Sequence, residues 1–398
     1  MRKSLYPMLL ALALIVPLLA ACGGGATGGT AATSAPVAQA TAAPAPTAAS
    51  APTTAPAPTA AAEATAAPAP TTAEATAAPE AKTLKVGLVT DVGKVDDKSF
   101  NQSAWEGVQQ AQKDLSADVK FIETTDPKDY QKNIEQFADA NYDVIVTVGF
   151  ALGEATYQDA KKYPNIKFIG VDQFQAKDDK HPDIPLANLA GLVFEEDKAG
   201  YLAGVLAASV SKSGTIGAVC GTDVVPAVWR YGEGYKAGAK SVKPDINVQV
   251  VYHSDVGFDK TFTDPEWGNT TGLAMIDKGA DVLFGCGGKT GNGALQAAAN
   301  KGVYAIGVDT DQYLTLPEAQ KAMISSAEKL ITPGVFGLIK SSQDGSFKGG
   351  NNVGPVGLAP FHDLDSKVPA DVKAKLQEVD KGLQDGSIKT NVPPTKPS

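Results

Sequence analysis

Short apolar runs alternate with amphipathic stretches along the chain from residue 83 to about residue 310. The runs are rich in Val and Ile and too short for typical helices, whereas the stretches between them have helical periodicity. Buried parallel strands with helical crossovers produce this pattern, which predicts α/β sheets with helices on both faces. The predicted strands are 84–90, 119–123, 143–148, 167–171, 189–194, 215–219, 248–252, 282–284 and 303–308. The predicted helices include 101–115, 128–140, 151–162, 196–210 and 369–385.

The strand and helix pattern starts again near residue 215, after a long apolar helix. Two successive blocks of four or five strands predict two similar lobes with open parallel sheets. We expect lobe 1 to comprise about 83–194 and 310–345, and lobe 2 about 195–309 and 346–398. The pattern assigns no function to residues 361–398.

The first 22 residues have the features of a targeting segment. Arg2 and Lys3 precede an apolar run over 5–21, which is marginal for spanning a bilayer and typical of a signal peptide. The run ends in Leu-Ala-Ala-Cys, which resembles the bacterial lipobox and implies lipid attachment at Cys22. The alternative is an ordinary signal peptide with a chance cysteine. Lipidation predicts a protein anchored to the extracytoplasmic face of the cell membrane, because two or more acyl chains anchor firmly.

Residues 23–82 consist largely of Ala, Pro and Thr. Such a composition cannot bury enough apolar surface to offset the entropy of ordering, and frequent prolines interrupt an Ala-rich helix. We predict a disordered linker.

Composition excludes several classes of protein. The chain of 398 residues has a formal net charge of −9, which disfavours a nucleic-acid binder. Its three cysteines show no CxxC spacing, and its three histidines are far apart, so we expect neither a metal site nor a cofactor. Cys220 and Cys286 could pair in an exported protein, but we favour two small buried hydrophobic side chains.

Polar or glycine-rich residues follow several predicted strands. Asp91, Asp172 and Asp309 lie at strand ends, and 285–288 is a glycine-rich loop. Ligands in open α/β sheets bind beyond the carboxyl ends of the strands, so these residues predict a polar site there. The alternative is that each aspartate only caps a turn or helix.

Longer motifs carry a specific resemblance. The stretch DVGKVDDKSFNQSAWEG at 91–107 is similar to the signature of the basic membrane protein (BMP) family, the substrate-binding lipoproteins of ABC transporters. Further similar segments are TVGFALG at 147–153, PAVWRYGEGY at 226–235, GGKTGNG at 287–293, GVDTDQ at 307–312 and SAEK at 326–329. The resemblance implies a type I periplasmic-binding fold with two Rossmann-like lobes, a three-stranded hinge and a ligand in the cleft. It implies no enzymatic activity.

The same resemblance implies a purine nucleoside as ligand and an ABC permease with its ATPase as partners. Phe100 and a second-lobe aromatic would clamp the purine, and for the second we favour Tyr231 over Phe262. The remaining expected ligand-binding residues are Asp91, Asn101, Asp172, Gly287, Gly288, Asp309 and Lys329. Asp309 is the candidate for the ribose diol, because a carboxylate accepts hydrogen bonds from two adjacent hydroxyls.

Three alternatives stay open from the sequence. The ligand could be another small polar molecule such as a sugar, or the protein could be a sensor that passes no cargo to a permease. Ser326 and Lys329 also have the spacing of a serine-enzyme motif, but the accompanying motifs are out of order.

Overall fold

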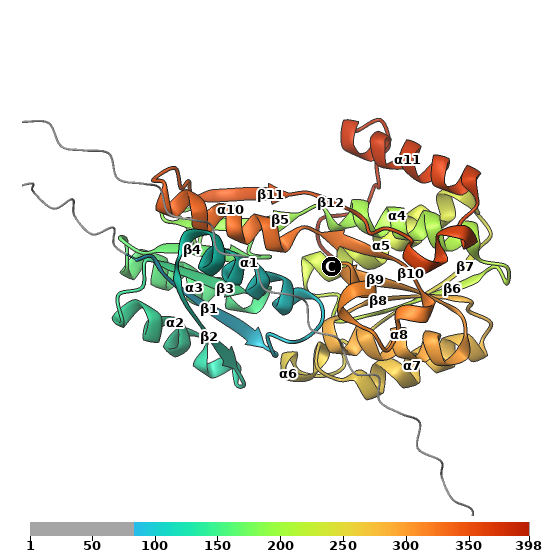
Figure 1. Ribbon diagram of the computed structural model, residues 1–398, viewed down its shortest axis with the longest axis horizontal. Helices are drawn as coiled ribbons and strands as arrows, with labels where there is room; N and C mark the ends of the chain where they lie inside the picture. Colours follow the sequence, from blue (N-terminus) through green and yellow to red (C-terminus); the bar gives the residue numbers. More distant parts are fainter. Residues whose placement is uncertain (1–82, 398) are drawn as a thin grey trace, which may run out of the picture. The chain divides into compact units, whose positions relative to one another are not determined.

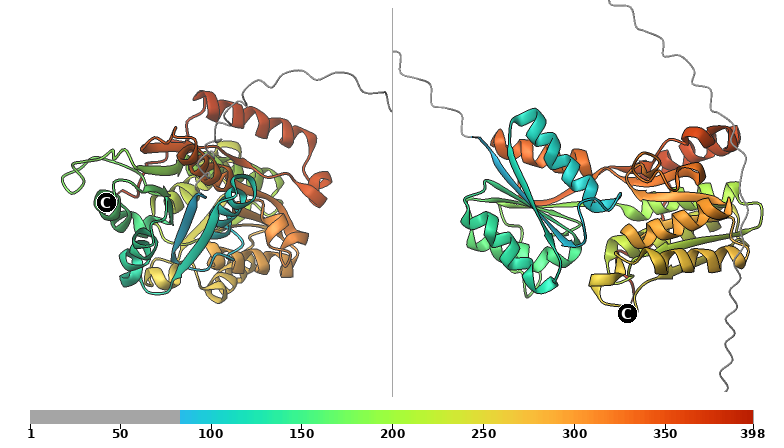
Figure 2. Two further views of the ribbon diagram at one scale, coloured as in Figure 1. Left: turned by 60° about the vertical axis from the view of Figure 1, so that its left-hand side comes forward. Right: turned by 60° about the horizontal axis from the view of Figure 1, so that its bottom comes forward.

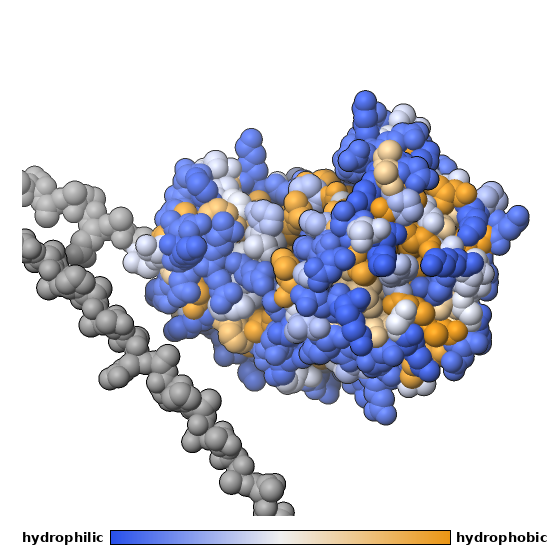
Figure 3. All heavy atoms as spheres, turned by 45° about the vertical axis from the view of Figure 1, so that its right-hand side comes forward, coloured by the Kyte–Doolittle hydropathy of each residue, from blue (hydrophilic) through white to orange (hydrophobic). Residues whose placement is uncertain are grey.

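The computed structural model describes residues 83–397 of the chain. Cys22 and the predicted linker over 23–82 lie outside these residues. The described chain contains two six-stranded sheets, one in each of two lobes (Figure 1). Within it, no helix is long and apolar enough to cross a membrane. The face in Figure 3 is mostly hydrophilic, with hydrophobic residues in small scattered groups.

The first lobe has its strands in the order β11-β5-β4-β3-β1-β2, all parallel. Its strands are β1 Lys85–Val92, β2 Asp118–Thr124, β3 Val144–Val148, β4 Lys167–Val171, β5 Leu189–Phe194 and β11 Gly350–Gly354. Its helices are α1 Phe100–Leu115, α2 Tyr130–Asp139, α3 Gly153–Lys162 and α10 Ile331–Gln343, with short 3-10 turns η1 Pro127–Asp129 and η2 Phe150–Leu152.

The second lobe repeats this plan in the order β12-β10-β9-β8-β6-β7, with β12 antiparallel to β10. Its strands are β6 Thr215–Cys220, β7 Asn247–Tyr252, β8 Val282–Cys286, β9 Tyr304–Asp309, β10 Met323–Lys329 and β12 Val356–Leu358. Its helices are α4 Glu196–Val210, α5 Pro226–Val242, α6 Phe258–Thr261, α7 Pro265–Asp277, α8 Gly288–Lys301, α9 Gln312–Thr315 and α11 Ala370–Asp385, with 3-10 turns η3 Gln320–Ala322 and η4 His362–Lys367.

The apolar runs are continuous because both faces of each sheet are covered. In β3, Val144 and Val146 pack in one cluster with α1 and α10, whereas Ile145 packs in another with α2 and α3. Successive side chains of a strand point to opposite faces, so a strand buried on both sides is mostly apolar instead of alternating with polar residues.

The chain crosses between the lobes three times, after Phe194, Lys329 and Gly354 (Figure 2). The crossings correct two of the expected lobe boundaries. Met323–Lys329 lies in the second sheet, although we placed 310–345 in lobe 1, and Gly350–Gly354 lies in the first, although we placed 346–398 in lobe 2. Both strands are poor in large apolar residues, so the pattern of apolar runs does not identify them.

Cys220 and Cys286 form a disulfide, so our preference for two unpaired cysteines was wrong. The pairing of parallel strands β6 and β8 places the two residues side by side, with their Cα atoms 4.2 Å apart. That register joins residues 66 positions apart and is not visible in the sequence.

Helices α4 and α5 pack with their backbones in direct contact. Gly200 and Gly204 of α4, and Gly234 and Gly238 of α5, each lack the Cβ that would collide with the other helix. A Cβ on Gly238 would lie 1.9 Å from the carbonyl oxygen of Tyr201. Two small residues four positions apart on each helix create this close approach.

We predict that Gly238→Ala destabilises the protein by about 1–3 kcal/mol, because the added methyl group forces the helices apart. The matched control is Gly337→Ala in α10, where an added Cβ has no heavy atom within 4 Å. This control should gain up to about 1 kcal/mol, since alanine favours helices. Urea denaturation measures both; equal effects would contradict the packing argument.

Candidate ligand-binding site

A cavity of about 750 Å³, part of it open to solvent, lies between the lobes at the carboxyl ends of their strands. All ten residues predicted from the sequence line it: Asp91, Phe100, Asn101, Asp172, Tyr231, Phe262, Gly287, Gly288, Asp309 and Lys329. The structure therefore brings together residues that are up to 238 positions apart. Their roles as ligand contacts stay predictions.

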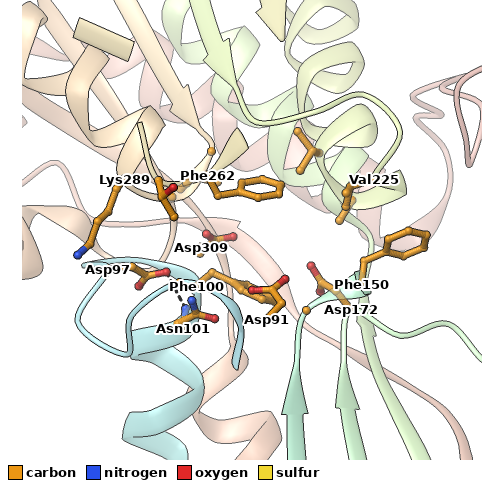
Figure 4. Close-up of a pocket in the computed structure, with 18 of the residues that line it drawn as sticks. Asp91, Asp97, Phe100, Asn101, Phe150, Asp172, Val225, Phe262, Lys289 and Asp309 are labelled. Carbon is orange, nitrogen blue, oxygen red and sulfur yellow. Dashed lines mark hydrogen bonds between the residues drawn. The ribbon is translucent and has the colours of Figure 1, made fainter. Parts of the chain in front are cut away.

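Two phenylalanines form opposite walls of the cavity. Figure 4 shows Phe262 of the second lobe on one side of the open space and Phe100, the first residue of α1, on the other. Tyr231 also lines the cavity but is only 2% exposed, and its hydroxyl donates to the carbonyl of Ala327 at 3.2 Å. Tyr231 therefore lines the cavity as a buried residue whose hydroxyl already has a partner.

Lys329 lies at the centre of a cluster of buried carboxylates. Its Nζ atom is 2.5 Å from Asp172, 3.6 Å from Asp309 and 3.8 Å from Glu196. Burial lowers the pKa of a lysine, yet these three carboxylates raise the pKa of Lys329 above its usual value. The ammonium also lies 4.6 Å from the centre of the Phe100 ring. Lys329 thus joins carboxylates of both lobes.

Two of these carboxylates belong to residues with an unusual backbone conformation. Asp172 and Asp309 have φ angles of 58° and 68°, in the left-handed region that few residues other than glycine adopt. Aspartate tolerates this region better than most residues, and such conformations cluster at functional sites. Burial raises the pKa of Asp309, although Lys329 and the Ser99 hydroxyl oppose the shift.

The loop before α1 is held by Asp97, which the sequence analysis did not select. Its carboxylate accepts hydrogen bonds from the backbone amides of Ser99, Asn101 and Gln102, and so caps the first turn of the helix. Burial raises the pKa of Asp97 to about 6 despite these bonds. The sequence did contain a signal for this role, because Asp97 lies just before a predicted helix, where Asp is favoured as a cap.

Asp91 faces the cavity because Gly149 leaves room for it. A Cβ on Gly149, whose φ is +117°, would lie 2.0 Å from the Asp91 carboxylate. Burial, and then the charges of Asp97 and Asp172, raise the pKa of Asp91 well above its usual value. The raised pKa favours the protonated form of Asp91, which can donate a hydrogen bond as well as accept one.

Two acceptors in the cavity wall have no hydrogen-bond partner within the described residues. They are the side-chain oxygen Oδ1 of Asn101 and the Oδ1 atom of Asp172, and both are buried. Buried polar atoms without partners are costly, so both oxygens favour a ligand that supplies donors.

The loop before α1 also contacts the second lobe directly. Asn292 Nδ2 donates to the Asp97 carbonyl at 2.8 Å, and Gln312 Nε2 donates to the Lys98 carbonyl at 3.1 Å. The Ser99 hydroxyl donates to Asp309 at 2.6 Å. These bonds hold the lobes together over the cavity.

Comparison with known proteins places the chain in a family. The family model for ABC transporter substrate-binding proteins of the PnrA-like (Bmp) type matches residues 84–354. The chain belongs to this family. Its similarity to the CD4+ T-cell-stimulating antigen of Listeria monocytogenes is 31% identity over 340 residues, covering 79% of this chain and 89% of that protein. A nucleoside-binding protein of an ABC transporter, BmpA of Lactococcus lactis, is 34% identical over 290 residues, covering 68% and 78%.

Solved structures agree on the fold of this Bmp-family protein. An ABC transporter solute-binding protein from Aeropyrum pernix K1 matches with a TM-score of 0.68 and 25% identity, covering 78% of this chain and 94% of that one. The predicted family and the predicted type I fold with two lobes are therefore confirmed.

The serine-enzyme motif has a structural role in this Bmp-family protein. Ser326 is fully buried in β10 and does not line the cavity, and its hydroxyl accepts a hydrogen bond from the Gln312 amide. Across residues 83–397, no group of three or more His, Cys, Asp or Glu side chains is arranged to hold a metal ion. Residues that the sequence analysis missed but that line the cavity include Lys94, Asp97, Phe150, Val225, Val228, Phe258, Cys286 and Lys289.

We predict that Lys329→Met destabilises the protein by about 3–5 kcal/mol at pH 7.5, because it leaves buried carboxylates without their cation. The loss should be smaller at pH 5. Without the cation, the pKa values of Asp309 and Glu196 rise further above their unfolded values, so stability falls as pH rises through that range. Urea denaturation at both pH values measures the effect.

The matched control for this prediction is Lys340→Met, whose exposed pair with Asp344 should contribute less than about 1 kcal/mol. Similar losses for the two variants, or a larger loss for Lys329→Met at pH 5, would count against the electrostatic role of the cluster.

Proposed function

We propose that this Bmp-family protein captures a purine nucleoside between its lobes and delivers it to a membrane permease. The observation that carries the proposal is the pair of aromatic walls, Phe100 and Phe262, with polar groups between and behind them (Figure 4). A flat heterocycle fits such a slot, because stacking on aromatic rings is favourable for any base. The nucleoside-binding relative in Lactococcus lactis supports the same class of ligand.

The sugar would bind at the carboxylate end of the slot. Asp172 and Asp309 are acceptors for ribose hydroxyls, and the unpartnered Oδ1 atom of Asp172 is available to one of them. Lys329 would keep both carboxylates in place, since it lies within 3.6 Å of each. A phosphate group is disfavoured there, because the carboxylates of this cluster outnumber its cations.

The edge of the base would bind to Asn101 and Asp91. Asn101 offers an unpartnered carbonyl oxygen, and its amide nitrogen is a donor. Asp91, whose pKa is raised, can donate a hydrogen bond to a ring nitrogen when protonated, or accept one from an amino group. Purines present both kinds of atom along their edges.

Capture would proceed by closure of the two lobes. Because Phe100 and Phe262 belong to different lobes, a bound base contacts both only in the closed form, and this difference favours closure. The permease would then recognise the closed form. A lipid anchor at Cys22 would keep the protein at the membrane. Relatives that are named as lipoproteins support this part of the proposal.

Calorimetry with adenosine, guanosine, inosine and ribose tests the ligand class. We expect a purine nucleoside to bind and ribose alone to bind far more weakly, because ribose lacks the stacked ring. Phe100→Ala and Phe262→Ala should each weaken nucleoside binding by about 1–3 kcal/mol.

The matched control is Phe174→Ala, since Phe174 is 69% exposed and does not line the cavity. This variant should bind like the wild type. Binding of ribose without binding of any nucleoside would instead identify a sugar-binding protein and end the nucleoside proposal.

We also predict that Asn292→Ala weakens nucleoside binding about tenfold without touching the ligand. The substitution removes the hydrogen bond from Asn292 to the Asp97 carbonyl and the bond that Asn292 accepts from Gln312 Nε2, which together contribute about 1.4 kcal/mol to the closed form. Asn269→Ala, which removes a bond within the second lobe, should leave affinity within about twofold. Small-angle scattering should show a larger mean radius for Asn292→Ala alone; unchanged affinity and radius would contradict this role.

A further inference from the structure

The Cys220–Cys286 disulfide lies directly beside the proposed base-binding slot. It joins the last residues of β6 and β8, at the carboxyl ends of the strands where the cavity opens. Cys286 lines the cavity, whereas Cys220 is fully buried and does not. The pairing of β6 with β8 ends at these two residues, so the covalent link lies at the end of the paired strands.

We propose that this disulfide is a positioning element of the ligand site, which holds the support on which the Phe262 ring rests. The inference deepens the proposed function and rests on it, since it assumes that Phe262 stacks on the base.

The support consists of the residues that follow the two cysteines. Gly221 lies against the Phe262 ring so closely that an added Cβ would be 2.1 Å from the ring atom Cε1. Gly287 in turn lies close to Gly221, because a Cβ added to Gly287 would be 2.5 Å from the Gly221 nitrogen. The Gly221 amide donates to the Cys286 carbonyl at 3.0 Å. The two strand ends and the ring therefore form one continuous stack.

The segment that carries Phe262 is attached at both ends to this stack. Where it begins, the His253 amide donates to the carbonyls of Cys220 and Gly221, at 3.2 and 2.6 Å. Where it ends, the Phe262 carbonyl accepts from the Thr290 amide at 3.3 Å, in the first turn of α8. The Thr261 hydroxyl donates to the His253 carbonyl and joins the two ends.

The disulfide thus links the two anchors of one loop. β6 supplies the anchor at His253, and α8, which directly follows β8, supplies the anchor at Phe262. Without the covalent link, we expect the distance between these anchors to fluctuate and the ring to spend less time at stacking distance. A ring that is already held in place loses less conformational freedom when the ligand binds, so holding it in place favours affinity.

A double-mutant cycle tests this inference. Nucleoside affinity is measured by calorimetry for the wild type, Cys220→Ala/Cys286→Ala, Phe262→Ala and the triple variant, with thermal unfolding to verify that each is folded. We expect loss of the disulfide to weaken binding about fivefold to tenfold in the presence of Phe262 and less than about twofold in its absence. A purely structural role would give the same factor in both backgrounds.

Single substitutions separate the covalent link from the atoms that line the cavity. Cys220→Ala removes only the link, whereas Cys286→Ala also changes the cavity wall, so equal losses for the two support a role of the link itself. Equal losses with and without Phe262, or no loss at all, would overturn the inference and leave the nucleoside proposal intact. A wild-type protein that binds no nucleoside would overturn both.

Discussion

The arrangement of the two lobes depends on one buried cation. Lys329 is the last residue of β10, directly before the chain returns to the first lobe, and it is only 3% exposed. Its partners come from both sides: Asp172 follows a strand of the first sheet, while Asp309 and Glu196 belong to the second lobe. Glu196 also pairs with Arg230. A buried charge needs such compensation, so the position of Lys329 fixes where both sets of strand ends meet.

The same cluster places the proposed site at the meeting point of the lobes. Asp172 and Asp309 reach the cavity in left-handed backbone conformations, and the ion pairs with Lys329 help to offset the conformational cost. Hydrogen bonds from Asn292, Gln312 and Ser99 then join the loop before α1 to the second lobe. Contacts within the protein therefore contribute to the stability of the closed form. A ligand has to supply only the rest of the free-energy difference between the open and closed forms.

Much of the fold could be predicted from the sequence because the central strands are buried on both faces. Runs such as Lys167–Val171 and Leu189–Phe194 coincide with β4 and β5, since an unbroken Val- and Leu-rich run has few alternatives. β10 and β11 were missed because they lie near the sheet edges or contain Ser, Glu, Lys and Asn, so neighbours rather than composition make them strands. The lobe boundaries were wrong for the same reason.

The motifs also identified residues that gather around one cavity, but they could not rank the aromatic side chains. Tyr231 and Phe262 both follow strands of the second sheet, and we favoured Tyr231 because it follows the first strand of lobe 2 as Phe100 follows the first strand of lobe 1. Only their tertiary contacts distinguish the two side chains. The Tyr231 hydroxyl donates to the Ala327 carbonyl, whereas the Phe262 ring packs on Gly221 and faces Phe100. The disulfide could not be predicted for the same reason, because the register of β6 with β8 decides which residues lie side by side.

Under the proposed function, a slot with one wall from each lobe would make binding of the base and closure of the lobes the same event. If both rings belonged to one lobe, a base would stack equally well in the open and closed forms and would shift no equilibrium. With Phe100 in one lobe and Phe262 in the other, each stacked face adds to the difference between the two forms. The support beneath Phe262 therefore bears on more than affinity: a ring that moved with its loop would let the base stack before the lobes had closed. A fixed ring would restrict the second stacking contact to the closed form, in which the carboxylates of both lobes would also contact the sugar of the proposed nucleoside.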